Sequence, residues 1–324
     1  MKLSLHFQKN RKLTVGLEFA NSGLRAAALA PSRSGPKVAA ATAVSAAVDD
    51  WWDAPEAEEV REQLDSFVKH HELKGCAAVL NVPSERTILR YLQLPPLPDK
   101  VLRNTVQMEL GVSIHLPFDD PTFDVVRVPP LNPDLPQGGA ETASCCLVAA
   151  PRSLVDHLVH LVADVGLHPV AVDVVPLALR RVSRPAELPD DGLNVCVYMD
   201  ARDITIAVFV GDFMYFVRTV PYLLRDEADG FTMSGYARDL GSEIERVVNF
   251  FNYNLSPVER PLAAIQLHSV AAEVDPVIEL LGQRFGCPVY RVQRDVAWPP
   301  EVAPDLLSVF YPAVGLAMKE RAKS

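Results

Sequence analysis

The sequence of 324 residues contains only five cysteines and no pair of the Cys-x-x-Cys type. Five is an odd number, and most of these cysteines lie among apolar residues, so we expect buried free thiols and neither disulfides nor a metal site. Aromatic residues are also scarce, at 7%. Because 49% of the residues are nevertheless hydrophobic, the composition favours aliphatic packing of sheets against helices, as in the α/β class.

Positive charge is in short supply, since the formal net charge is −10 and the one basic patch is Lys9, Arg11 and Lys12. Nucleic acids and anionic membrane surfaces both bind through clustered Lys and Arg. No apolar run approaches the ~18 residues that a membrane helix needs, and no secretory signal follows Met1. The sequence therefore predicts a cytoplasmic protein that binds no nucleic acid, has no membrane span, and reaches a membrane only through a partner.

The middle of the chain consists of a strand, a proline corner, a helix and a second proline corner. Residues 87–94 alternate polar and apolar side chains, as in a half-buried strand, and the prolines at 95, 96 and 98 end it. From Asp99 the apolar residues recur every three or four positions until Gly111, which predicts a helix. This arrangement favours a compact inserted α+β unit.

Two other stretches have the pattern of a strand, a tight turn and a second strand. The first covers residues 13–29, with its turn at residues 21–23, and the second covers residues 193–212, with its turn at residues 201–203. Repetition of this pattern implies two lobes of similar architecture. A chain of this length also exceeds what one ordinary core supports.

Three motifs in the middle of the chain resemble the type IV pilus assembly protein PilM family. They are Arg-x-Leu-x-Leu-Pro-x-Leu-Pro at residues 90–98, Leu-Pro-Phe-Asp-Asp at 116–120 and Phe-Asp-Val-Val at 123–126. The order of the remaining elements fits that family over nearly the whole chain. Its fold is actin-like and related to the cell-division protein FtsA, so the resemblance implies an α/β fold of duplicated actin-like (ribonuclease H-like) lobes.

The resemblance also implies a division of the chain. The first part of the first lobe is expected at residues 1–83, the inserted α+β subdomain at 84–168, a return helix and hinge at 169–189, and the second lobe at 190–324.

In actin-like proteins, ATP with Mg²⁺ binds between two phosphate loops. The resemblance places Glu18, Asn21 and Ser22 in the first loop, Thr205 in the second, and Glu243 and Arg246 near the nucleoside. On the residues alone, the first loop is an ordinary hairpin turn, and Glu243 and Arg246 are an ion pair at positions i and i+3 of a helix.

Several residues depart from the family's nucleotide motifs. Ala20 and Ala201 replace glycines, Met199 replaces an aspartate, and His268 with Ser269 replaces a glycine pair beside the adenine. A Cβ in place of a glycine hydrogen keeps backbone amides away from a phosphate. These departures favour a non-catalytic scaffold of a type IV pilus or related secretion system, without a nucleotide cofactor.

Two alternatives stay open. One is an active ATPase of the same family, which binds ATP with Mg²⁺ and uses Glu18 at the metal. The other is a sugar- or acetate-kinase-like phosphotransferase, which shares the duplicated fold but needs glycine-rich loops and an acidic base.

The family also implies a partner, the short N-terminal cytoplasmic segment of a PilN-like bitopic protein of the inner membrane, docked between the first lobe and the inserted subdomain. An extended peptide there gains main-chain hydrogen bonds and side-chain pockets. Four large apolar residues at the proline corners are candidates for the wall of this groove: Leu92, Leu94, Leu97 and Phe118. Packing of these four inside the core is the alternative. Self-association of the chain is left open.

Overall fold

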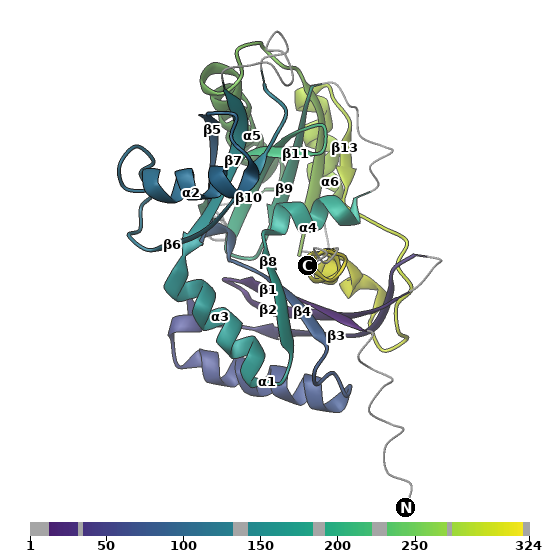
Figure 1. Cartoon of the computed structure of the whole chain (residues 1–324). Helices are drawn as coiled ribbons and strands as arrows, with labels where there is room; N and C mark the ends of the chain where they lie inside the picture. Colours follow the sequence, from purple (N-terminus) through teal and green to yellow (C-terminus); the bar gives the residue numbers. More distant parts are fainter. Residues whose placement is uncertain are drawn as a thin grey trace, which may run out of the picture.

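The structure, a computed structural model, describes residues 13–31, 35–131, 142–183, 192–221, 232–270 and 274–319. Two lobes lie one above the other, each built on a five-stranded sheet, and a smaller three-stranded unit lies beside them (Figure 1). The duplicated α/β lobes predicted from the repeated hairpins are therefore confirmed.

The two large sheets have the same topology. The first has the order β3-β2-β1-β4-β8, with β1 Thr14–Ala20, β2 Gly23–Ala30, β3 Lys37–Ser45, β4 Ala77–Asn81 and β8 His168–Asp173. The second has the order β11-β10-β9-β12-β13, with β9 Leu193–Met199, β10 Asp203–Val210, β11 Phe213–Pro221, β12 Leu262–Ser269 and β13 Val289–Arg291. In both sheets the first three strands pair antiparallel, and the other two pairings are parallel.

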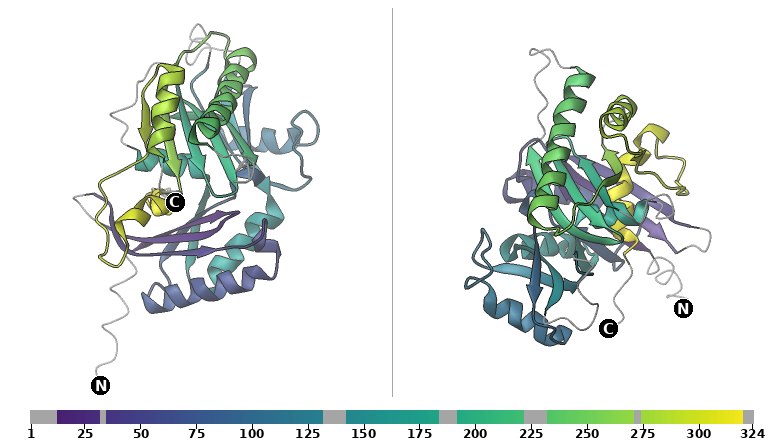
Figure 2. Two further views of the ribbon diagram at one scale, coloured as in Figure 1. Left: turned by 180° about the vertical axis from the view of Figure 1, so that it is seen from behind. Right: turned by 90° about the horizontal axis from the view of Figure 1, so that it is seen from above.

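Helices cover both faces of each sheet, which explains why the central strands β1, β2, β9 and β10 are buried at nearly every position. The outer face of the first sheet is covered by α1 Glu56–His70 and α3 Arg152–Asp164, and that of the second by α5 Met233–Asn254 and α6 Asp275–Phe285 (Figures 1 and 2). Between the lobes lie α4 Val175–Val182 and α7 Tyr311–Ala317.

Two glycines allow the inter-lobe helix α7 to approach its neighbours closely. A Cβ at Gly16 of β1 would lie 1.8 Å from the carbonyl oxygen of Ala313, and one at Gly315 would lie 2.1 Å from that of Ala178 in α4. Backbone therefore packs on backbone where the lobes meet, and neither position has room for a side chain.

The smaller unit is an antiparallel sheet of order β5-β7-β6 with one helix. Its elements are β5 Ile88–Leu94, α2 Asp99–Glu109, β6 Pro121–Arg127 and β7 Ala143–Pro151. The strand, proline corner and helix expected at residues 87–111 are thus present. A small core between α2 and the sheet includes Val106, Phe123 and Leu147.

Helix α3 buries its apolar side in the core of the first lobe. Its residues Leu158 and Val162 are fully buried and belong to the same apolar cluster as Val15 and Leu17 of β1. We therefore infer that the inserted unit ends with β7, whereas the sequence alone extended it to residue 168. Of the expected return helix and hinge, α4 is present, and residues 184–189 lie outside the described part of the chain.

The five cysteines carry thiols rather than disulfides, and four of them are buried. Burial raises the pKa of Cys146 and of Cys196 to about 12, so both are thiols at neutral pH. None of the described helices is both long and apolar enough to cross a bilayer.

Candidate functional site

The turns of the two repeated hairpins meet between the lobes. The backbone N–H of Ser22, in the turn after β1, donates to Asp200 Oδ2 at 3.2 Å, and its hydroxyl donates to Asp200 Oδ1 at 2.6 Å. Beside it, the Asn21 amide donates to Asp203 Oδ2 at 3.4 Å. Arg202 of the second turn also forms an ion pair with Asp49, which follows β3 in the first lobe. The two turns are therefore in direct contact.

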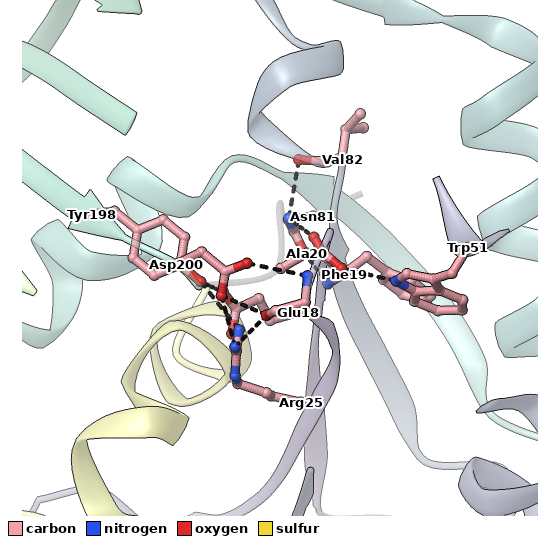
Figure 3. Close-up of polar contacts among 10 residues, drawn as sticks. Glu18, Phe19, Ala20, Arg25, Trp51, Asn81, Val82, Tyr198 and Asp200 are labelled. Atoms are coloured by element: carbon pink, nitrogen blue, oxygen red, sulfur yellow. Dashed lines mark hydrogen bonds and ion pairs between the residues drawn. The ribbon is translucent and has the colours of Figure 1, made fainter. Parts of the chain in front are cut away.

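Behind these turns lies a buried group that we call the inter-lobe ion cluster: Glu18, Arg25, Tyr198 and Asp200 (Figure 3). The Arg25 guanidinium donates to Asp200 Oδ1 at 2.7 Å and to the Tyr198 hydroxyl at 3.2 Å, and it lies 3.2 Å from Glu18 Oε2. The Tyr198 hydroxyl in turn donates to Glu18 Oε1. One cation from β2 thus bridges carboxylates of both lobes.

Electrostatics favour a charged Arg25 between the two carboxylates. Burial opposes its charge, but Glu18, Tyr198 and Asp200 together raise the pKa of Arg25 well above its ordinary value. Burial raises the pKa of Glu18, and the coulombic attraction of Arg25 opposes that rise. Burial and the negative charge of Glu18 raise the pKa of Tyr198, which stays a neutral donor.

His268 of β12 lies against the ion cluster. Its ring stacks on that of Tyr198, with centroids 5.5 Å apart and an angle of 16° between the planes. Burial, followed by the positive charge of Arg25, lowers the pKa of His268 to about 3, so the imidazole is neutral at physiological pH. His268 is one of the two residues that replace the family's glycine pair, so the position expected beside an adenine here carries a buried ring.

The end of β1 is held by Asn81, the last residue of β4 (Figure 3). Its side-chain oxygen accepts from the backbone N–H of Phe19 at 2.7 Å, and its amide donates to the carbonyl oxygens of Phe19 and Val82 at 2.9 and 3.0 Å. On the opposite side, the Trp51 indole donates to the Ala20 carbonyl at 2.8 Å. The strand that carries Glu18 is therefore fixed from both sides.

The nucleotide-site residues expected from the sequence separate into two groups. Glu18, Asn21 and Ser22 come together with the second hairpin turn. The others make contacts of their own: Thr205, the cross-strand partner of Tyr198, shares a hydrogen bond of 3.1 Å with Thr219, while Glu243 and Arg246 form an ion pair with each other on α5.

Met199, matched above to an aspartate of the family, is buried in β9. The next residue, Asp200, directs its carboxylate to Ser22 and Arg25. Arg25 and Tyr198 were missed by the sequence analysis. A charged residue inside the apolar run of residues 24–29 was the available signal for Arg25, since a buried charge in a central strand requires a partner.

A groove of about 270 Å³ separates the inserted sheet from the first lobe. It is mostly apolar and lined by β6 and β7 on one side and by the ends of β4 and β8 with α4 on the other. Val126 of β6 and Val172 of β8 both line it, although they are 49% and 36% exposed. At one end lies a polar group in which Asp173 pairs with Arg181 and, at 3.0 Å, with Lys319.

Two features suit this groove to an extended peptide. Both β6 and β8 stand at the edge of their sheets as the structure describes them, so each presents backbone groups to a further strand. Exposed valines on both edges supply apolar contact.

None of the four groove residues proposed from the sequence lines this groove. Leu92, Leu94 and Phe118 are half-buried and pack around the core of the inserted unit, and Leu97 is half-buried at the corner before α2. Within the described ranges, no three His, Cys, Asp or Glu side chains are grouped so as to hold a metal ion.

Two α/β lobes of identical strand order, with helices crossing between them, define an actin-like fold. More specifically, the chain belongs to the PilM family, because the family profile described as type IV pilus assembly protein PilM matches residues 16–222.

Solved structures agree with this fold. The chain is similar to a structure described as the PilM-PilN type IV pilus biogenesis complex, with a TM-score of 0.72, 21% identity, and coverage of 95% of this chain and 98% of that one. It is also similar to the cytoplasmic domain of EpsL, an inner-membrane component of the type II secretion system of Vibrio cholerae, with a TM-score of 0.51, 12% identity, and coverage of 95% and 96%. No curated protein sequence matches the chain.

Proposed function

We propose that this chain is a non-catalytic scaffold of type IV pilus assembly, which recruits a membrane-anchored, PilN-like partner through the groove between the first lobe and the inserted unit. Membership of the PilM family supports a role in type IV pilus assembly, and the similarity to a PilM-PilN complex supports a PilN-like partner.

The position of Arg25 is the observation that carries the non-catalytic part of the proposal. In actin-like ATPases a phosphate group and its metal ion lie between the two hairpin turns. Here the Arg25 guanidinium already pairs with both Glu18 and Asp200, and Ser22 bonds directly to Asp200. A metal ion would face a fixed cation of like charge, and a phosphate would have to separate the turns. These residues do not fit a Mg²⁺–nucleotide group.

The remaining nucleotide contacts are equally unsuited. Ala20 retains a Cβ at the first turn, and Tyr198 and His268 fill the adjacent space with stacked rings. The active-ATPase alternative therefore requires the ion cluster to break before ATP binds.

The groove supports the recruiting part of the proposal. A single extended segment fits between two sheet edges, where it gains main-chain hydrogen bonds on either side and buries Val126 and Val172. A chain of net charge −10 without a membrane-spanning helix among its described residues is then brought to the membrane by that segment.

Two measurements on the purified full chain test the proposal. We expect no ATP turnover above background in the presence of Mg²⁺, and we expect binding of a synthetic peptide that copies the N-terminal cytoplasmic segment of the PilN-like protein of the same organism. Mg²⁺-dependent hydrolysis that Glu18→Ala abolishes would contradict the non-catalytic role. Absence of peptide binding would contradict the recruiting role.

A further inference from the structure

The inter-lobe ion cluster and the groove are connected through Asn81. Strands β1 and β4 pair in parallel only as far as Leu17 and Leu80, and beyond that point they diverge. The Asn81 side chain spans the gap, because it bonds to both backbone polar groups of Phe19. Phe19 directly follows Glu18 of the ion cluster.

On its other side Asn81 adjoins the wall of the groove. Its amide donates to the Val82 carbonyl, and the Val82 backbone N–H donates to the Asp173 carbonyl at 3.1 Å. Val82, Asp173 and the following Val174 all line the groove. The buried amide of Asn81 therefore joins the end of β1, which carries Glu18, to the wall of the groove.

We propose that the ion cluster holds the lobes closed in place of a nucleotide, and that Asn81 transmits this closed state to the groove, so that the groove is formed without any bound nucleotide. This inference rests on the proposed recruitment of a peptide by the groove. It adds that affinity for the peptide is set in part by residues that never contact it.

The physical basis is a difference in contacts between a closed and an open arrangement of the lobes. When the cluster is intact, Arg25 and Ser22 of the first lobe bind Asp200 of the second. Without the guanidinium, Glu18 and Asp200 are left as buried carboxylates without their cation, and separation of the turns lets water reach both. The end of β1 then moves with Glu18, and Asn81 must either follow it or leave the Phe19 backbone groups without partners.

The test compares the full-length wild type with Arg25→Met, Asn81→Asp and the double variant. Met keeps much of the arginine's apolar stem without its charge, and Asp keeps the shape of Asn while losing the two donated hydrogen bonds. Hydrogen exchange at the Ser22 amide reports opening of the turns, and calorimetry with the synthetic PilN-like peptide reports the groove. Should Asn81→Asp fail to fold, Asn81→Ser replaces it.

We expect Arg25→Met to speed exchange at Ser22 and to weaken peptide binding about tenfold, a factor typical of coupling between two sites. In the Asn81→Asp background the same change should weaken binding less than about twofold, because the connection is already broken. Arg61→Met, on the exposed face of α1, is the matched control and should alter neither readout.

The remaining outcomes separate the two proposals. If Arg25→Met opens the turns but binds the peptide as tightly as the wild type, the coupling is refuted. If Arg25→Met weakens peptide binding equally in the wild-type and the Asn81→Asp backgrounds, the coupling does not pass through Asn81. If the wild type itself does not bind the peptide, the proposed function fails, and this inference fails with it.

Discussion

The molecule has two junctions that involve the first lobe, and they differ in chemistry. At the junction with the second lobe, charged side chains from both sides are buried and paired, and the hairpin turns touch. At the junction with the inserted unit, the surfaces are mostly apolar and leave a groove of about 270 Å³. Direct side-chain contacts hold the first, closed junction together, whereas at the second, open junction β6 and β8 stand at the edges of their sheets as the structure describes them. The proposed peptide site therefore belongs to the second junction.

Both junctions lie at the same end of the first sheet. Asn81 and Asp173 are the last residues of β4 and β8, and Glu18 lies two residues before the carboxyl end of β1, which runs parallel to β4. In open α/β sheets this is the end where ligands bind. The carboxyl end of this sheet thus contributes residues to the ion cluster and to the wall of the groove. Asn81 lies between them and contacts both.

The largest expected effect is the loss of stability when the closed junction is broken. Arg25→Met leaves two buried carboxylates without their cation, and such changes destabilise proteins by about 3–5 kcal/mol. Urea unfolding of the variant and the wild type measures the difference. Arg61→Met removes an exposed pair with Glu58 and should have little effect. Equal stability of Arg25→Met and wild type would show that the cluster does not hold the lobes together.

A smaller effect is expected at the open junction. Val172→Lys puts a charge on an exposed edge of the groove, so the fold should tolerate it, but a docked peptide would have to cover the charge. We expect peptide affinity to fall at least about tenfold, which is about 1.4 kcal/mol. Calorimetry measures affinity, and the melting temperature checks the fold.

The matched control for that substitution is Val101→Lys on α2, where the valine is 45% exposed and does not line the groove. If both lysine variants bind the peptide equally well, the peptide does not lie along β8, and the groove is not its site.

The sequence predicted those parts of the fold that local patterns encode. The strand-turn-strand pattern occurs twice and gave the duplicated lobes, and the prolines at 95, 96 and 98 marked the corner between β5 and α2. Both features depend on residues close together in the chain. The inter-lobe ion cluster does not, because Arg25 and Asp200 are 175 positions apart and meet only when the lobes are stacked.

The groove was harder to predict because its residues resemble core residues in sequence. Leu92 and Phe118 are large and apolar and lie at proline corners, yet they pack around the core of the inserted unit. Val126 and Val172 are ordinary strand valines. Only the placement of β6 opposite β8 exposes their side chains in a groove, and alternation along a strand does not reveal which sheet faces another.

The smallest predicted effect concerns Glu85, which lies in the 3-10 helix Ser84–Arg86 between the two junctions. Its Oε1 is buried and accepts no hydrogen bond from the described residues, and burial, with the negative charges of Asp50 and Asp200, raises its pKa to about 7. In the unfolded chain this carboxyl ionises near its ordinary value of 4.5. Between these two values the folded protein binds more protons, so its stability falls as the pH rises from about 4.5 to about 7.

Glu85→Gln removes this ionisation. The free energy of unfolding at pH 8 should therefore rise by about 1 kcal/mol relative to that at pH 5, after allowance for partial exposure. Urea unfolding at the two pH values measures the change. Part of the pH dependence should persist, because burial and the charge of Glu85 also raise the pKa of Asp203 to about 7. Glu59→Gln on the exposed face of α1 is the control. An unchanged difference between pH 5 and pH 8 in Glu85→Gln would show that this carboxyl is solvated in the folded protein and that the region between the two junctions is open to water.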